Sequence, residues 1–336
     1  MTTFAGSLAR FTSLLLSLGA VAALATPNDW TITLLPGVGN DAAIARSVND
    51  RGDIVGDSYP VDAQTGGSGA PRATLWTNGV AQDLGNGEAF DVNAGGTIAG
   101  THFPGGESLW NGGQWTALGV GLAGFPLYVN NSGVVASSYP NGGIPHAYTW
   151  TAGVVTDLGT LGGTESQSYA INSRGAVVGY SQTAGNVSIH PFVYESGSMK
   201  DLGTLGRQQG KAVAINKGGV VVGFVSDRFD GSPAAFIDDG VMRPLFASGP
   251  CCSIASAINE RGDVVGTING QSGFLVENGM VTMLDQLPAV RAAGWTRLLP
   301  EGINNRGWIV GMGLRGGPAP QGRVPWRAFV LKPGKN

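Results

Sequence analysis

The sequence is poor in cysteine and in charge: it has two cysteines among 336 residues, 13% charged residues and a net charge of −3. Two cysteines cannot make a scaffold held together by disulfides. No cluster of lysine or arginine is present, which excludes a nucleic-acid-binding surface of the basic type. No segment after the first 25 residues is apolar enough to cross a membrane. These absences predict one large or two ordinary domains in a chain that stays off the membrane.

The N-terminal segment MTTFAGSLARFTSLLLSLGAVAALA has one arginine, an apolar stretch and a small-x-small ending at Ala23-Leu24-Ala25. This order is typical of a secretory signal peptide. A retained membrane anchor is the alternative, but the apolar run is short and interrupted. We therefore expect residues 1–25 to be removed and residues 26–336 to form a single exported domain.

Glycine is abundant, with 56 residues, and many glycines belong to a repeat. The repeat is best seen when the chain is aligned on asparagine: SVNDRGDIVG, DVNAGGTIAG, YVNNSGVVAS, AINSRGAVVG, AINKGGVVVG, AINERGDVVG and GINNRGWIVG. The period is close to 43 residues, and self-similarity at such a period indicates a repeat architecture. The repeat centres are Asn49, Asn93, Asn130, Asn172, Asn216, Asn259 and Asn304.

Each repeat has a second half, in which an apolar-aromatic segment such as HAYTW or HPFVY is followed by a glycine turn and a short DLG segment. Asparagine opens the first turn and a glycine three residues later suits a positive φ. Four short antiparallel strands per repeat are typical of a propeller blade. The sequence thus predicts an all-β fold, a seven-bladed β-propeller of four-stranded antiparallel blades. The last repeat lacks a fourth strand, so we expect WTITLLPG (30–37) to pair into that blade and close the ring.

The repeats resemble the HAF-repeat family of probable extracellular proteins. SYAINSRGAVVGYS, IHPFVYESGSMKDLGTLG and HAYTW carry the resemblance, which covers residues 30–331. It implies export and a repeated β fold, and no established activity. Only His146 and His190 match the family's histidine, so this histidine is not required in every blade.

The asparagine turns and the turns after the aromatic segments should lie on one face of the ring. The loops on the opposite face vary in length, and variable loops on a rigid scaffold are the usual place for function. We therefore expect a binding site on that upper face, near the channel mouth. Its predicted polar rim consists of Asp41, Asp57, Glu88, Glu107, Glu165, Arg207, Lys211, Arg228, Trp295 and Arg297.

Cys251 and Cys252 lie on this face and are adjacent in sequence. A disulfide between neighbours would be strained and would act as an apolar platform or a redox switch; two free thiols are the alternative. His102, His146 and His190 fall on separate blades, so no metal site and no cofactor is expected. The aspartates of the DLG segments, Asp83, Asp157 and Asp201, should accept hydrogen bonds from a neighbouring turn.

No sequence motif of a hydrolase, metalloprotease, phosphate-binding loop or calcium loop is present. The two Arg-Gly-Asp tripeptides, at 51–53 and 261–263, occupy the repeated turn and are interpreted as structural. We expect a non-catalytic binding or scaffold module that is secreted and monomeric and that binds a glycan or an extracellular protein. Two alternatives are a hydrolase or lyase acting on an extracellular polysaccharide, which would need a carboxylate pair, and a structural matrix protein. The candidate ligand-binding residues are Cys251, Cys252, Asp57, His102, Glu165, Arg207, Arg228, Trp295 and Arg297.

Overall fold

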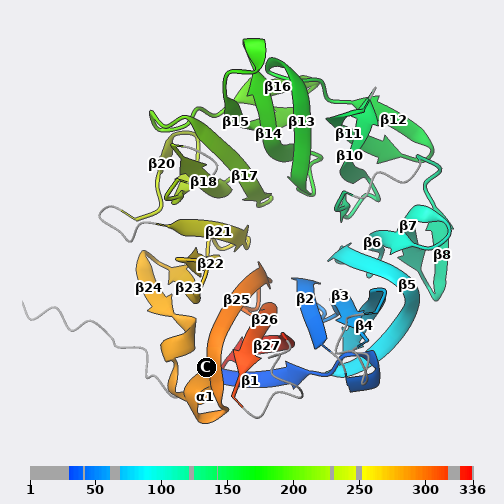
Figure 1. Cartoon of the computed structure of the whole chain (residues 1–336), viewed down its shortest axis with the longest axis vertical. Coiled ribbons are helices and arrows are strands. Elements are labelled where there is room, and N and C mark those ends of the chain that lie inside the picture. Colours follow the sequence, from blue (N-terminus) through cyan, green and yellow to red (C-terminus); the bar gives the residue numbers. More distant parts are fainter. Residues whose placement is uncertain are drawn as a thin grey trace, which may run out of the picture.

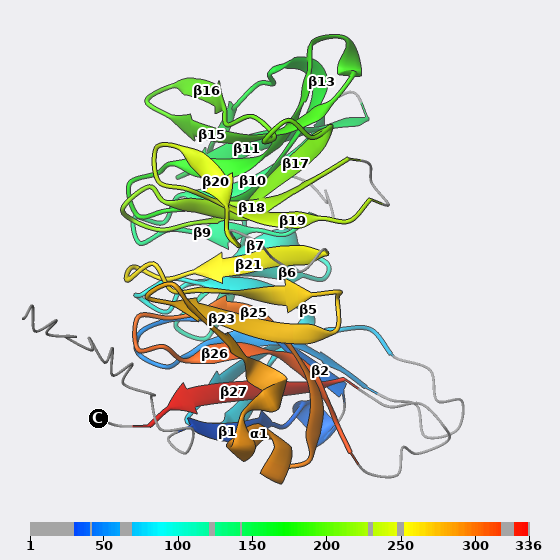
Figure 2. The same ribbon diagram turned by 90° about the vertical axis from the view of Figure 1, so that its left-hand side faces the viewer.

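The fold is seen in a computed structural model that describes residues 30–40, 42–60, 69–120, 125–141, 143–227, 231–246, 252–316 and 326–334. It is built from short antiparallel strands placed around a common centre (Figure 1). Short strands and tight turns suit a sequence rich in glycine, valine and isoleucine. Seen from the side, many of the strands run between the two faces of the ring (Figure 2). The expected all-β fold is therefore confirmed.

The first strands in the chain form one seven-stranded sheet that is continuous through a long strand. Residues 80–86 of this strand pair with β4 and residues 87–92 pair with β6, so it bridges two four-stranded groups. The members in order are β2 (Ala42–Val48), β3 (Ile54–Tyr59), β4 (Arg72–Thr77), β5 (Val80–Val92), β6 (Ile98–His102), β7 (Gly106–Asn111) and β8 (Gln114–Ala117).

The next sheet has four strands: β9 (Tyr128–Val129), β10 (Val135–Asn141), β11 (Ile144–Thr151) and β12 (Val154–Asp157). An eight-stranded sheet follows, in which β15 and β17 are joined by a single parallel residue pair, Ile189 with Gln209. Its strands are β13 (Gly162–Ile171), β14 (Val177–Thr183), β15 (Ile189–Glu195), β16 (Ser198–Asp201), β17 (Gln209–Ile215), β18 (Val221–Ser226), β19 (Ala234–Asp238) and β20 (Met242–Pro244).

Two further four-stranded sheets complete the ring. One consists of β21 (Ser253–Ile258), β22 (Val264–Ile268), β23 (Ser272–Glu277) and β24 (Met280–Met283). The other has the order β1-β27-β26-β25, with β1 (Trp30–Leu35), β25 (Trp295–Ile303), β26 (Ile309–Arg315) and β27 (Arg327–Pro333). The first strand of the chain therefore pairs with the last, from Trp30 opposite Pro333 to Leu35 opposite Ala328.

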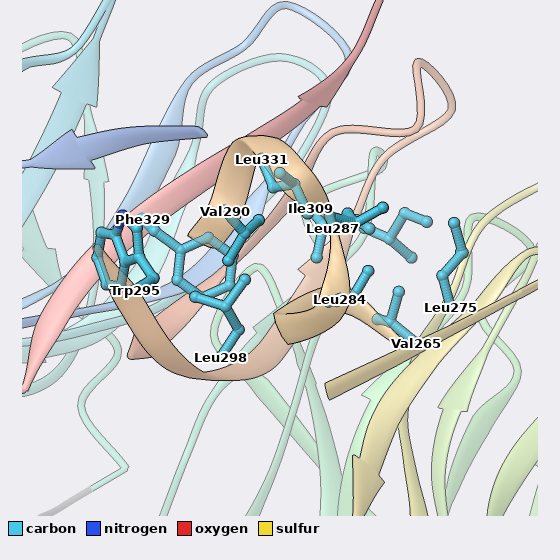
Figure 3. Close-up of a cluster of buried hydrophobic side chains, with 11 residues drawn as sticks. Val265, Leu275, Leu284, Leu287, Val290, Trp295, Leu298, Ile309, Phe329 and Leu331 are labelled. Atoms are coloured by element: carbon cyan, nitrogen blue, oxygen red, sulfur yellow. The ribbon is translucent and has the colours of Figure 1, made fainter. Parts of the chain in front are cut away.

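The helical segments are short. They are η1 (Val38–Asn40), η2 (Ala184–Asn186), η3 (Leu284–Gln286) and α1 (Pro288–Ala292). Leu284, Leu287 and Val290 from η3 and α1 pack with Leu298 and Phe329 in a buried apolar cluster between β23, β25 and β27 (Figure 3). No helix among the described residues is both long and apolar enough to cross a bilayer.

The repeated asparagines form a closed ring of hydrogen bonds. The Asn49 Nδ2 donates to the backbone oxygen of Asn93 at 3.0 Å, Asn93 does the same to Asn130, and the series continues through every repeat. Asn304 closes the ring by donating to the oxygen of Asn49 at 2.9 Å. All seven residues are buried. The asparagine therefore links each repeat to the next, a role beyond the turn-opening role expected from the sequence.

The asparagine also holds its own turn. In Asn259, Oδ1 accepts hydrogen bonds from the backbone N–H groups of Arg261 and Asp263. The glycine at the third position after asparagine has the expected positive φ, for example 86° at Gly262. These contacts satisfy the backbone donors of a buried turn, which would otherwise be costly.

The second glycine of the repeat, which ends the segment VVG, is required for a different physical reason. Gly266 lies opposite Ala255, next to a β-bulge in β21. A Cβ on Gly266 would overlap the backbone oxygen of Ile254. The same register and overlap recur at Gly179 and Gly223. This glycine is therefore needed for close backbone approach and not for positive φ.

Candidate functional site

The first strand of most repeats, which we call the inner strand, contains a β-bulge. The side chains at these bulges are the starting point for a candidate site. A bulge places one extra residue on the strand and redirects its side chain. The bulged residues lie three positions before the repeat asparagine and differ in every strand, whereas the residues around them are alike. They are Arg46 in β2, Phe90 in β5, Tyr169 in β13, Val213 in β17, Ser256 in β21 and Glu301 in β25.

Arg46 is held by neighbours on two sides. Its Nε donates to Asp57 Oδ2 at 2.6 Å and its Nη2 lies 3.5 Å from Glu88 Oε1. Its guanidinium also lies 5.3 Å from the centroid of the Phe90 ring. Burial raises the pKa of Asp57 to about 6, although Arg46 acts in the opposite direction. Asp57 is fully buried, so it serves to hold Arg46 and does not face a ligand.

A second group of side chains gathers on β13, β14 and β17. The Lys211 Nζ lies 3.3 Å from the Tyr169 hydroxyl, 5.6 Å from the Tyr169 ring centroid and 4.4 Å from the Tyr180 ring centroid. Burial lowers the pKa of Lys211, and Glu165 partly offsets this. A lysine between two aromatic rings gains cation–π attraction and keeps donors available for a ligand.

Glu165 is the acidic member of the same group. Its Oε1 accepts hydrogen bonds from the Tyr180 hydroxyl at 2.5 Å and from Gln167 at 3.2 Å, and its Oε2 accepts one from Gln182 at 3.2 Å. The carboxylate is thus fixed by three side chains. We call Glu165, Gln167, Tyr169, Tyr180, Gln182 and Lys211 the tyrosine–lysine cluster.

Tyr128 in β9 and Glu301 in β25 also lie on inner strands. Both interact electrostatically with Arg46, and Tyr128 does so with Tyr169 as well. Burial raises the pKa of Tyr128, with smaller contributions from Tyr169, Asp91 and Arg46, the last acting to lower it. Burial also raises the pKa of Glu301, and Arg46 lowers it. Glu301 is nonetheless solvent-exposed, so it is surrounded by protein but accessible to water. The inner strands therefore place aromatic and charged groups within electrostatic range of one another.

The structure contradicts the expected rim position of Trp295 and Glu107, as it does that of the fully buried Asp57. Trp295 is 3% exposed and packs edge-on against Phe329 at 5.8 Å between ring centroids, because its indole completes the apolar cluster next to α1. Glu107 is 1% exposed and faces Tyr148. All three were predicted as exposed polar or aromatic rim residues, and that prediction was wrong.

Other predicted site residues have structural partners. His102 stacks on Trp115 at 5.5 Å between ring centroids. Arg207 pairs with Asp227 at 3.1 Å, and Arg297 donates to Gln271 at 2.6 Å. The oxygen of Cys252 accepts a hydrogen bond from Asn269 N at 2.7 Å. Cys251, Arg228 and Asp41 lie outside the described residues. The choice between a vicinal disulfide and two free thiols, which involves Cys251, lies outside them as well.

The histidines and aspartates of the repeat are partners of each other. His146 Nδ1 lies 3.0 Å from Asp157 Oδ2, and His190 Nδ1 lies 2.8 Å from Asp201 Oδ2. Asp157 also accepts the N–H of Gly159, and Asp201 that of Gly203. The expectation that these aspartates accept hydrogen bonds from a turn is confirmed. Across the described part of the chain, no three His, Cys, Asp or Glu residues gather in a way that could hold a metal ion.

The Glu107 carboxyl in β7 is a buried group whose hydrogen-bonding capacity is only partly satisfied. Its Oε2 accepts a hydrogen bond from the Tyr148 hydroxyl, whereas its Oε1 is buried with no hydrogen-bond partner among the described residues. Burial raises the pKa of Glu107 to about 7. A carboxyl group with one unpaired oxygen is less costly to bury when it is protonated.

This burial predicts a pH dependence of stability. The folded chain binds the Glu107 proton more tightly than the unfolded chain, so the free energy of unfolding should fall as the pH rises from about 4.5 to about 7. The loss is at most about 3 kcal/mol. E107Q should remove this part of the slope, so that the variant is more stable than the parent at pH 8. Urea unfolding across this pH range measures the difference, with the exposed-site variant E277Q as control; parallel curves for parent and E107Q would contradict the assignment.

The rim expected from the sequence includes Glu88, Glu165 and Lys211 but not Arg46, Tyr169 or Tyr180. The signal was available in the position three residues before each asparagine, which varies between repeats. Its meaning depends on the bulge, and a bulge is a property of strand pairing that a single strand does not reveal.

Comparison with known proteins supports the fold. No protein-family model and no curated protein matches the chain. Among solved structures, the chain is similar to an acylaminoacyl peptidase from Pyrococcus horikoshii, with 9% identity, a TM-score of 0.58 and coverage of 86% of this chain and 51% of that one. It is also similar to the β-propeller domain of the Trilobed protease from Pyrococcus furiosus, with 14% identity, a TM-score of 0.52 and coverage of 74% and 85%. TolB from Acinetobacter baumannii matches with 12% identity, a TM-score of 0.47 and coverage of 71% and 61%. The chain thus spans about half to two thirds of the peptidase and TolB chains. The similarity to the propeller domain of the Trilobed protease identifies its fold as a β-propeller.

Proposed function

We propose that the chain is an exported, non-catalytic binding module built as a seven-bladed propeller, and that it binds a glycan at the tyrosine–lysine cluster. Seven blades are supported by the ring of seven asparagine hydrogen bonds. Closure by the N-terminal strand is supported by the pairing of β1 with β27. Export rests on the signal-peptide pattern of residues 1–25, and the resemblance to the HAF-repeat family agrees with it.

The observation that carries the glycan proposal is the chemistry of the cluster. Two tyrosine rings lie at 5.8 Å between centroids with an angle of 38°, and Lys211 lies against both. Around them are a carboxylate and two amides, which offer both donors and acceptors. Tyr180 is buried, so the face that a sugar ring could contact is that of the partly exposed Tyr169. An aromatic face with fixed polar groups beside it is what a sugar ring with its hydroxyls requires. An extracellular protein partner would instead need a larger contact surface.

The carboxylates of the predicted rim are mostly occupied by structural contacts. Asp57 holds Arg46, Glu165 accepts three side-chain hydrogen bonds, and Glu107 is buried. A glycosidase needs one carboxylic acid and one carboxylate placed on either side of the scissile bond. We therefore favour binding over hydrolysis.

A glycan array with the mature chain tests the proposal, and every bound glycan is then assayed for turnover. We expect binding to at least one glycan, weakened at least about tenfold by Y169A or K211A, because each removes a stacking or cation contact. K332A is the matched control, since Lys332 also lies over an aromatic ring, 3.6 Å from the Trp308 centroid, but on another strand. Binding unaffected by Y169A and K211A would refute this site, and release of sugar fragments would refute a non-catalytic role.

A further inference from the structure

The asparagine-turn face has a cavity between the β13–β16 and β17–β20 strands. These two groups lie side by side (Figure 1), and within the described residues their backbone strand pairing is limited to Ile189 with Gln209, at the ends far from the asparagine turns. Side-chain hydrogen bonds, such as that from Asn172 to the oxygen of Asn216, also join them. Toward the turns they enclose a cavity of about 480 Å³. This volume is in the range of small-molecule sites, roughly 300–1,000 Å³. We call it the turn cavity.

Arg174, which lines the turn cavity, lacks the aspartate partner that Arg51 and Arg261 have, whereas Arg306, at the same turn position, lies over the Trp308 ring instead. In the first and sixth repeats, Arg51 pairs with Asp53 and Arg261 with Asp263, each at 2.5 Å within an Arg-Gly-Asp turn. In the fourth repeat the turn reads Arg174-Gly175-Ala176, so the aspartate is replaced by alanine. No ion pair of Arg174 is present among the described residues.

The paired arginines also cover the turn of the next repeat. Arg51 lies over Gly96, and a terminal nitrogen of Arg261 lies 3.1 Å from where a Cβ of Gly307 would be. The corresponding glycine after Arg174 is Gly219, which has open space on that side. Arg51 and Arg261, which pair with aspartate, therefore cover the turn of the next repeat, whereas Arg174 does not cover Gly219.

The turn cavity is lined by charges of both signs, with Arg174, Lys200 and Glu195 on one side and Asp238 on the other. Arg174 and Lys200 come from the β13–β16 side, and Asp238 comes from the β17–β20 side. Glu195, at the end of β15, adds a second carboxylate. None of these four forms an ion pair within 4.0 Å in the described part of the chain, so cations and anions line the same cavity without neutralising each other.

We propose that the turn cavity is a binding site for a small zwitterion of the free amino acid or short peptide type. Its carboxylate would lie at Arg174 and Lys200, and its ammonium group at Asp238 and Glu195. Arginine favours carboxylates because its guanidinium can donate two parallel hydrogen bonds. A ligand with charges at both ends pairs with the cations and the carboxylates of the lining at once, whereas a simple anion or cation leaves one of these two sets unpaired. This site is separate from the tyrosine–lysine cluster and does not depend on the glycan proposal.

Isothermal titration calorimetry of the full mature chain with L-alanyl-L-alanine tests the proposal. We expect saturable binding, and binding at least about tenfold weaker for N-acetyl-alanyl-alanine, which lacks the ammonium group, and for alanyl-alanine amide, which lacks the carboxylate. No binding of the uncapped dipeptide at concentrations up to about 10 mM, or equal binding of the capped forms, would overturn it.

Three variants locate the site. A176D restores the Arg-Gly-Asp turn of the first and sixth repeats, so Arg174 should pair with the new aspartate and the dipeptide should no longer bind. R174A should lose binding in the same way, whereas R51A, at the same turn position of another repeat, should bind like the parent. Thermal unfolding of each variant shows whether it is folded. A folded A176D chain that binds as tightly as the parent would also refute the proposal.

Discussion

Deleting residues 28–37 should abolish cooperative folding of the chain. These residues include β1, whose six residues pair with β27 and cover its outer edge. Leu35 is 1% exposed in one apolar cluster, and Trp30 and Ile32 pack against another. Without β1 the sheet would lose its outer strand, expose apolar surface of both clusters and present an unpaired edge. We expect a broad, weakly cooperative urea transition in place of a single sharp one.

Two point variants of β1 separate the role of its packing from that of chain length. L35D should reproduce much of the effect of the deletion, because it places a charge in a buried apolar cluster. L34D should change the free energy of unfolding by less than about 1 kcal/mol, since Leu34 is 37% exposed. A truncated chain that unfolds like the parent would show that the ring does not need its N-terminal strand.

Replacing one asparagine of the ring should have the next largest effect, with N130A as the example. The Asn130 Nδ2 donates to the oxygen of Asn172, and its Oδ1 accepts the N–H groups of Ser132 and Val134. Alanine would leave one buried acceptor and two turn donors without this partner. Each unsatisfied buried group costs about 1–3 kcal/mol, so we expect the free energy of unfolding to fall by at least about 3 kcal/mol.

The adjacent residue offers the matched control for this asparagine. Asn131 is exposed, and its side chain accepts one hydrogen bond from Ala94 N. N131A should therefore lower the free energy of unfolding by less than about 1 kcal/mol. N130D tests the direction of the inter-repeat bond, because aspartate keeps the acceptor for the turn but loses the donor to Asn172. If N130A and N130D were as stable as N131A in urea unfolding, the hydrogen-bond ring would not contribute to stability.

The fold was largely predictable because its signals are local and repeated. Asparagine and glycine at fixed positions mark the turns, and alternating apolar residues mark the strands, so the positions of the strands follow from the repeat. The pairing of β1 with β27 could be expected because the last repeat is one strand short. The hydrogen bond from each asparagine to the next repeat could not be predicted, because it depends on how neighbouring repeats are placed relative to each other.

The candidate sites were less predictable, and Trp295 and Tyr169 show why. A tryptophan near a variable loop is compatible with a binding surface, but Trp295 is buried because η3 and α1 fold back over it. Tyr169 lies in a strand segment that reads like any other inner strand, and only the bulge opposite Gly179 redirects it. Burial and side-chain direction both depend on contacts between residues far apart in sequence.

The sequence by itself determined the β class, the repeat, the positions of the turns and the structural meaning of the Arg-Gly-Asp tripeptides, because these depend on local conformational preference. Tertiary structure alone decided which side chains meet. It brought Lys211 to Tyr169 and Tyr180 on neighbouring strands and buried Glu107 against Tyr148. Among the residues that the structure describes, it also left Arg174 without a carboxylate partner beside an open glycine turn. Binding chemistry arises from groups that converge in space, and convergence is set by how the repeats pack around the ring.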